Sequence, residues 1–180
     1  MRHILLTYLF VFSMCSSAQN FGVFTGINIG QTMLDLNENF EGKPESLGAL
    51  GVGLSVGYMS DFQFITQLGA TSSQNFSLFG AADRYDLRHV DILVGYQARW
   101  KKLSFTPKIG YANWELNSKE GQFLNPGREE ERKQSGNDFL WGASLDYLVN
   151  NKFALSLSYK NIDTDFVDYD LSHIEFLFNF

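Results

Sequence analysis

The chain has 180 residues and a net charge of −6, from 14 Lys and Arg against 20 Asp and Glu, and its length fits one domain. Because the chain is acidic and has no basic block, we expect no nucleic acid partner. No stretch of 18 or more apolar residues occurs, which excludes a membrane-spanning helix. Only 3 Pro accompany 16 Gly and 17 Phe, a composition that favours strands over disorder.

The N-terminus is typical of a cleaved secretory signal peptide. A short basic start is followed by the apolar residues 4–12 and by Ser16, Ser17 and Ala18. We expect cleavage after Ala18, so that residues 1–18 are the signal and residues 19–180 the mature domain. Two alternatives are a buried N-terminal helix or strand, and a lipoprotein attached through Cys15, which lacks the small residue that lipid attachment needs before it. Cleavage removes Cys15, the only Cys, so disulfides cannot stabilise the mature chain.

Eight segments of the mature chain alternate between apolar and polar or small residues. In residues 47–58, for example, Leu50, Val52 and Leu54 alternate with Gly51 and Gly53. A period of two with this density of Gly predicts strands and excludes helices. The segments are residues 21–32, 47–58, 62–70, 90–100, 103–114, 139–147, 153–160 and 173–180.

Alternation alone fits both a soluble sandwich and a membrane β-barrel. Three features favour the barrel. The connections alternate between short turns, such as residues 101–102, and long polar loops, such as 33–46, 71–84, 117–136 and 161–168. The polar face is rich in Gly and Ser, as a narrow barrel interior requires. Aromatic residues gather near the short turns, as in one interfacial girdle: Phe21, Tyr58, Phe62, Trp100, Phe105, Tyr147, Phe153, Phe178 and Phe180.

The signal peptide, the eight strands and the last strand, residues 174–180, resemble the small OmpA/OmpX-type outer-membrane β-barrels. Residues 90–96 and 140–147 also resemble strands of that family. The resemblance implies an all-β, eight-stranded, antiparallel up-and-down transmembrane β-barrel, and it implies that Phe180 is part of the insertion signal. Pro107 departs from the pattern, because it predicts a bulge or a lost hydrogen bond within the fifth strand.

Alternation places six charged residues inside the predicted barrel. Because an eight-stranded barrel is just filled by its side chains and isolated buried charges are costly, we expect a salt-bridge and hydrogen-bond network. Lys160 and Glu175 are the pair expected to lie close together. A narrow conducting pore is the alternative. The six residues are Asp91, Arg99, Lys108, Asp146, Lys160 and Glu175.

An enzyme is a further alternative, because some small barrels modify lipid A. Ser172, His173 and Glu175 superficially offer a nucleophile, a base and a carboxylate, with His89 as the other mature His. Adjacent residues on a strand point to opposite faces, so Ser172 and His173 cannot act together. We therefore expect no catalytic residue.

The long loops carry the remaining candidate features. Four Asp within residues 163–170 could hold a hard cation, although a solvated loop is the simpler interpretation. The charges of the third loop balance, with Lys119, Arg128, Arg132 and Lys133 against Glu120, Glu129, Glu130 and Glu131. Aromatic residues on the loops are candidate contacts for a partner: Phe76, Phe79, Phe123 and Phe166.

The sequence therefore predicts a monomeric, non-enzymatic protein of the bacterial outer membrane. Its expected role is envelope integrity, or surface adhesion and partner binding through the long loops. The expected partners are outer-membrane lipid and lipopolysaccharide, the barrel-insertion machinery, and host or surface ligands. We expect no cofactor and no metal. A soluble ligand-binding barrel is another alternative, and in it the apolar faces would point inward.

Overall fold

The computed structural model describes residues 22–36, 45–75, 84–119, 131–164 and 167–180. Within these residues every regular element is a strand: β1 (Gly22–Leu36), β2 (Glu45–Met59), β3 (Phe64–Gln74), β4 (Arg84–Tyr96), β5 (Ala98–Trp100), β6 (Leu103–Lys119), β7 (Glu131–Asn150), β8 (Phe153–Asp163) and β9 (Val167–Asn179). In this part of the chain there is no helix long and apolar enough to cross a bilayer.

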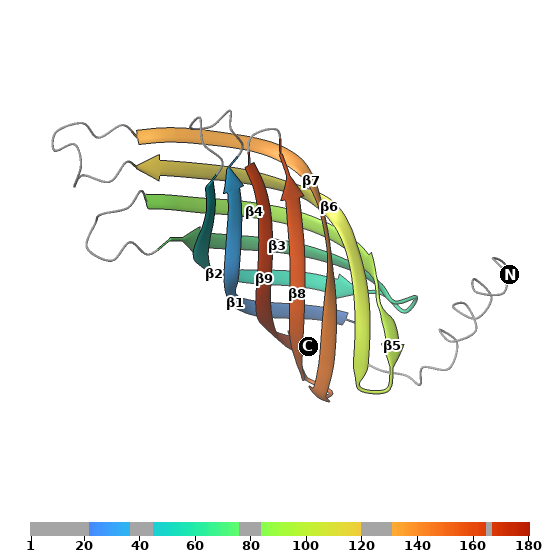
Figure 1. Ribbon diagram of the computed structural model, residues 1–180. Coiled ribbons are helices and arrows are strands. Elements are labelled where there is room, and N and C mark those ends of the chain that lie inside the picture. The colour runs from blue at the N-terminus through green and yellow to red at the C-terminus, as the bar shows by residue number, and fades with distance from the viewer. Residues whose placement is uncertain (1–21, 37–44, 76–83, 120–130, 165–166) are drawn as a thin grey trace, which may run out of the picture.

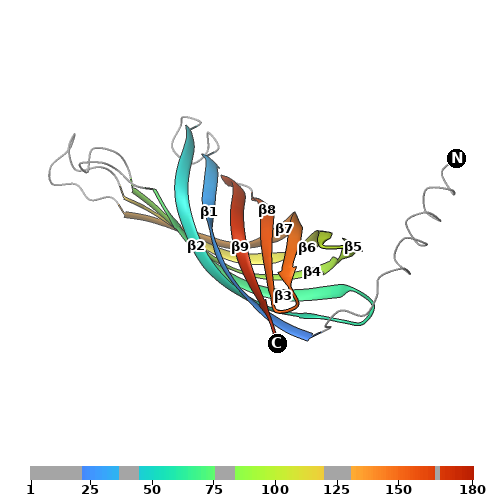
Figure 2. The same cartoon turned by 90° about the horizontal axis from the view of Figure 1, so that it is seen from below.

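The strands form one closed antiparallel barrel (Figures 1 and 2). Sequential strands pair with each other except β4 and β5. β1 pairs with β9 and β4 with β6, so the barrel closes. β4 and β5 follow one another along the same edge of β6 and together occupy one strand position of the barrel. The barrel therefore has eight strand positions. The predicted fold class is thereby confirmed.

The polar and apolar faces of the strands decide between the barrel alternatives. Leu54 is 62% exposed and Ile92 49%, although both lie mid-strand, whereas Asp91 beside Ile92 is 1% exposed. A soluble barrel or sandwich would bury the apolar face instead. We call these outward-facing residues the apolar belt: Val23, Ile27, Ile29, Met33, Leu50, Val52, Leu54, Val56, Tyr58, Phe64, Leu68, Val90, Ile92, Val94, Trp100, Leu103, Phe105, Ile109, Tyr111, Phe139, Trp141, Leu145, Tyr147, Leu155, Leu157, Ile174, Phe176 and Phe178.

The two ends of the barrel differ. Short connections, residues 60–63, 101–102 and 151–152, join strands at the end that we call the turn end. The first described residue, Gly22, and the C-terminus also lie there, because Phe24 pairs with Asn179. The other ends of the strands, where β1 meets β2, β3 meets β4, β6 meets β7 and β8 meets β9, lie opposite and form what we call the loop end (Figure 1). Lys101 adopts a φ of 56° in its two-residue turn, a left-handed conformation that is uncommon outside glycine.

Most strands extend further toward the loop end than the alternation predicted. The sixth predicted segment covers residues 139–147, whereas β7 has 20 residues. Beyond the belt the outward residues of β6 and β7 become polar, as at Asn113, Glu115 and Lys133, while the backbone pairing continues. The alternation of apolar residues in the sequence therefore ends at the edge of the belt, whereas the strands continue beyond it.

Pro107 interrupts the ladder without a bulge. Gly95 of β4 pairs with Lys108, and Ala98 of β5 pairs with Phe105. The register against β6 is therefore the same on both sides of the gap between β4 and β5. The gap between β4 and β5 lies opposite Pro107, which has no N–H to donate. Of the two predicted outcomes, the structure therefore shows the lost ladder hydrogen bond.

Aromatic side chains mark both boundaries of the belt. At the turn end, Trp100 is 62% exposed and the Lys101 Nζ lies 5.4 Å from its ring centroid. At the other boundary, Tyr111 contacts Phe139 edge-to-face and Trp141 contacts Tyr159. This second group, confined to β6, β7 and β8, was not predicted. Phe21 lies outside the described residues.

Candidate functional site

The barrel interior has three layers along its axis. An apolar cluster fills the loop end, polar and charged residues fill the middle, and a smaller apolar group lies at the turn end. The middle layer contains the buried residues Asn28, Ser55, Gln67, His89, Asp91, Gln97, Ser104, Thr106, Ser144, Asp146, Ser156, Ser158, Lys160, His173 and Glu175.

Lys160 and Asp91 form an ion pair across the lumen. The Lys160 Nζ lies 2.7 Å from Oδ2 of Asp91, and the two side chains are 6% and 0% exposed. His89, two residues before Asp91 on the same inward face, places its Nε2 3.3 Å from the same oxygen. The Lys160 charge is therefore met by Asp91, and the predicted partnership of Lys160 with Glu175 is wrong.

Glu175 instead belongs to a neighbouring group on other strands. The Ser55 hydroxyl donates to Oε1 of Glu175, and Gln67 Nε2 donates to the same oxygen at 3.2 Å. Lys108 Nζ in turn donates to Oε1 of Gln67 at 2.9 Å. The amide of Gln67 thus connects the carboxylate of Glu175 to the ammonium of Lys108.

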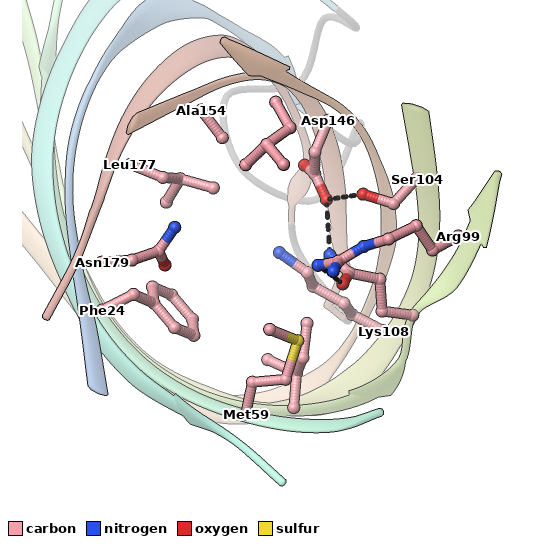
Figure 3. A pocket seen from close by; sticks show the side chains of 12 residues that line it. Phe24, Met59, Arg99, Ser104, Lys108, Asp146, Ala154, Leu177 and Asn179 are labelled. Carbon is pink, nitrogen blue, oxygen red and sulfur yellow. Dashed lines mark hydrogen bonds between the residues drawn. The ribbon is translucent and has the colours of Figure 1, made fainter. Parts of the chain in front are cut away.

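Asp146 is the centre of a third group, next to the turn end. Ser156 donates to Oδ1 of Asp146 at 2.6 Å, and Gln97 Nε2 donates to Oδ2 at 3.3 Å. Arg99 donates to Oε1 of Gln97 at 2.7 Å. Asp146 and Arg99 lie on one side of a small cavity of about 50 Å³ (Figure 3). Its other side is closed by Phe24, Met59 and Leu177.

The six charged residues predicted to face inward are thus divided among three groups, each held together by its own contacts. All six side chains are buried or half-buried. The polar residues that connect them were missed, namely Ser55, Gln67, Gln97 and His89. The alternation of the strands does predict that these side chains point inward. It does not predict their partners, because partners across the lumen depend on the stagger between strands.

The loop end of the interior is mostly apolar. Trp114 and Tyr169 have ring centroids 5.5 Å apart, and both are at most 2% exposed. The Trp114 indole donates to Oδ2 of Asp138 at 2.6 Å. Around them, the cluster consists of Leu34, Tyr85, Leu87, Leu93, Ala112, Leu116, Leu140, Ile162 and Leu171. Buried hydroxyl groups of Thr32, Ser73 and Ser118 also lie at this end, and those of Thr32 and Ser73 are hydrogen-bonded to each other at 2.7 Å.

The residues of the enzyme alternative are not brought together. Ser172 is exposed on the outer face, whereas His173 is buried on the inner face. His89 lies beside Asp91, and within the described residues neither of its ring nitrogens has a hydrogen-bond partner. Among the residues that the structure describes, no group of three or more His, Cys, Asp or Glu could hold a metal ion.

Part of the acidic segment lies at the loop end. Asp168 pairs with Asp35 on β1 and with Asp163 on β8, so three carboxylates meet on adjacent strands. Burial, a hydrogen bond with Asp163 and the charges of Asp163 and Asp35 raise the pKa of Asp168. Asp165, Phe76, Phe79, Phe123, Phe166 and residues 128–130 lie outside the described residues.

A closed barrel with an outward apolar belt, aromatic boundaries and a polar interior is the architecture of a membrane-spanning β-barrel. The family model described as the outer membrane protein beta-barrel domain matches residues 4–180. The chain belongs to this family. Outer-membrane β-barrels sit in the bacterial outer membrane with short periplasmic turns and longer extracellular loops. This agrees with the resemblance to the small OmpA/OmpX-type barrels.

Solved outer-membrane barrels have the same fold. Neisserial surface protein A is 13% identical with a TM-score of 0.66, over 88% of this chain and 97% of that one. The attachment invasion locus protein Ail of Yersinia pestis is 15% identical with a TM-score of 0.62, over 89% and 100%. The N-terminal barrel domain of Pseudomonas aeruginosa OprF is 14% identical with a TM-score of 0.53, over 89% and 100%. No curated protein was found to match the chain.

Proposed function

We propose that the protein is a non-enzymatic outer-membrane barrel that supports envelope integrity and presents its long loops to partners at the cell surface. The observation that carries this proposal is the filled interior. The apolar layer of Leu34, Trp114 and Tyr169 covers the loop end, and cross-lumen contacts such as Lys160–Asp91 occupy the middle. A barrel filled in this way acts through its outer wall and its loops.

The filled interior also argues against a narrow pore. Ions would have to pass the mostly apolar layer and then separate buried charges that are paired with each other, and both steps are costly. We therefore expect no conductance steps when the protein, purified from outer membranes, is added to a planar bilayer. A porin with 16 strands serves as the positive control. Reproducible single-channel steps would contradict the structural role.

The two parts of the proposed role are separable by deletion. A strain without the protein should become more permeable to a large hydrophobic antibiotic, and the full chain should restore the barrier. A chain lacking residues 121–129 should restore the barrier equally but lose any binding to surface ligands. If that shortened chain also fails to restore the barrier although it folds, the loops and the wall do not have separate roles.

A ligand at the loops has some support from structures of this fold. Ail of Yersinia pestis has been solved in complex with the heparin analogue sucrose octasulfate. In the present chain the long connections join a rigid frame at one end, which suits them for recognition. Binding of sulfated glycans to whole cells, with and without residues 121–129, tests this part.

We also propose that residues 1–18 are removed on export. The basic start and the apolar residues 4–12, followed by Ala18, support this site. N-terminal sequencing of the protein from outer membranes should begin at Gln19. A protein that begins at a lipidated Cys15 would contradict it.

A further inference from the structure

The outer wall has a groove at the loop-end boundary of the apolar belt, over β2, β3, β4 and β6. Its volume is about 670 Å³. The floor is Ala70 on β3, which pairs with Leu54 on one side and Val90 on the other. Leu54 is 62% and Val90 57% exposed, so two large side chains stand on either side of one methyl group. The short side chain of Ala70 creates the hollow.

In the next row of residues toward the loop end, Val52 remains apolar, whereas Ser72, Arg88 and Glu115 are polar or charged. Ser72 pairs with Val52 and with Arg88, and Arg88 pairs with Glu115. All four line the groove. Two residues along the strands thus separate an apolar floor from a charged rim, a distance comparable to that between a lipid chain and its headgroup.

Arg88 is the group at the rim that can meet an anion. Its side chain is 63% exposed, and its Nη2 donates to Oδ2 of Asp86 at 2.9 Å. A guanidinium has five N–H donors, so this one bond leaves others for a phosphate. The Glu115 carboxylate is already matched, because Lys133 lies 2.9 Å from Oε2 and Asn117 donates to Oε1 at 3.1 Å.

The neighbouring part of the wall, over β6, β7 and β8, is built differently near this boundary. There the boundary is lined by Tyr111, Phe139, Trp141 and Tyr159, which contact each other in pairs. Aromatic side chains fill the interfacial zone of a membrane protein. The described residues of β2, β3 and β4 have no aromatic side chain at this boundary, and the groove takes its place.

We propose that this groove binds a phosphorylated lipid of the outer leaflet, with an acyl chain over Ala70 and the headgroup phosphate at Arg88. The groove is continuous with the apolar belt, which is in contact with lipid hydrocarbon. An acyl chain can therefore enter the groove without leaving the bilayer. Its loop-end rim lies toward the extracellular leaflet, where the lipid headgroups carry phosphates. The alternative occupant is a second copy of this chain. It would have to fill the hollow with a protruding side chain and match the charges of both Arg88 and Glu115.

Native mass spectrometry of the full mature protein tests the proposal. Nanodiscs of phosphatidylcholine with a small fraction of bis-phosphorylated lipid A provide the lipid, and retained lipid is counted after release in mild detergent. The wild type should retain lipid A in preference to phosphatidylcholine, and it should retain dephosphorylated lipid A about tenfold less well, since a charge-assisted hydrogen bond is lost.

Two variants locate the site, and each has a control. Ala70→Leu fills the floor and should reduce retained lipid A to the level of phosphatidylcholine. Arg88→Ala should weaken retention about tenfold, to the level of the dephosphorylated lipid. Thr66→Leu changes an outward residue of β3 nearer the turn end, and Lys101→Ala removes a cation at the turn end. Both controls should retain lipid A as the wild type does.

Migration on unheated gels first establishes that each variant forms a closed barrel. Equal retention of lipid A by Ala70→Leu, Arg88→Ala and the wild type would overturn the proposal. Equal retention of phosphorylated and dephosphorylated lipid by the wild type would overturn it without any variant. A mass of two protein chains that Ala70→Leu reduces to one would assign the groove to self-association instead.

Discussion

The Lys160 Nζ on β8 donates a hydrogen bond of 2.7 Å to Oδ2 of Asp91 on β4, on the far side of the barrel. Because both side chains are buried, this pair resists solvent screening and connects strands that do not pair with each other. The stability of the barrel therefore depends on contacts through its lumen as well as on the ladder of backbone hydrogen bonds.

Asp91→Ala should destabilise the barrel by about 3–5 kcal/mol, because it leaves the Lys160 ammonium buried and unpaired. The double change Asp91→Leu with Lys160→Met should recover most of this loss. Urea unfolding in lipid vesicles gives the free energies. The control is Asp86→Ala, which breaks the exposed pair with Arg88 and should cost less than about 1 kcal/mol. Equal effects of Asp91→Ala and Asp86→Ala would show that the buried pair has no special role.

Gly110→Ala should prevent correct closure between β4 and β6. A Cβ at Gly110 would collide with the backbone carbonyl of Ile92, which cannot move without breaking the ladder. We expect a loss of more than about 2 kcal/mol and a low refolding yield, measured by migration before and after heating. Gly48→Ala is the matched control, because its nearest atom is Gln31 Nε2 at 3.4 Å. Normal folding of Gly110→Ala would mean that the strands can separate at this point.

Pro107→Val should stabilise the barrel by about 1 kcal/mol. The substitution restores an N–H opposite the gap between β4 and β5 and places a β-branched side chain on the outward face. The unfolding midpoint in urea measures the change. Ile109→Val alters the same strand and face without altering the ladder, so it should show no gain. A destabilised Pro107→Val would indicate that the gap itself relieves strain.

Phe180→Ala should reduce assembly in cells more than it reduces stability in vitro. Phe180 is 80% exposed and its N–H donates to the Val23 carbonyl at 3.0 Å, a backbone bond that the change preserves. If the side chain is read by the insertion machinery, the amount of folded barrel in outer membranes should fall several-fold while detergent refolding stays normal. Phe178→Ala, which alters another outward aromatic on the last strand, provides the comparison. Equal losses in both assays would reduce the role of Phe180 to packing.

Asp35→Asn should stabilise the loop end at neutral pH and have little effect in acid. The pKa of Asp168 is raised by burial and by Asp163 and Asp35, so the stability that this group contributes is complete below its unfolded pKa. That contribution is lost as the pH rises through the raised folded pKa. Removing the Asp35 charge should therefore flatten the decline, which urea unfolding at pH 3 and pH 7 can measure. Parallel curves for both proteins would exclude coupling between Asp35 and Asp168.

The fold could be predicted because the period of two is a local property of each strand. Residues such as Leu54 and Asp91 lie on the faces that alternation gives them. Strand ends were predicted less well, because beyond the belt the outward side chains of β7 are polar and the backbone pairing of Arg132 with Ser118 leaves no hydrophobic pattern.

Partners across the lumen could not be predicted from parity. Lys160 pairs in register with Leu171, and Glu175 with Ser156, so the two charges lie four residues apart along the last hairpin. The tilt and stagger of a closed barrel instead bring Lys160 to the level of Asp91. The groove over Ala70 is a tertiary feature of the same kind, since it requires residues of four strands in register.

The apolar layer at the loop end has a consequence for the cell that makes this protein. Under the proposed structural role, a barrel filled by Leu34, Trp114, Tyr169 and their neighbours adds wall surface without adding a route for solutes. Copy number would then be uncoupled from leakage, so that the cell could cover much of its surface with this protein and keep its osmotic barrier.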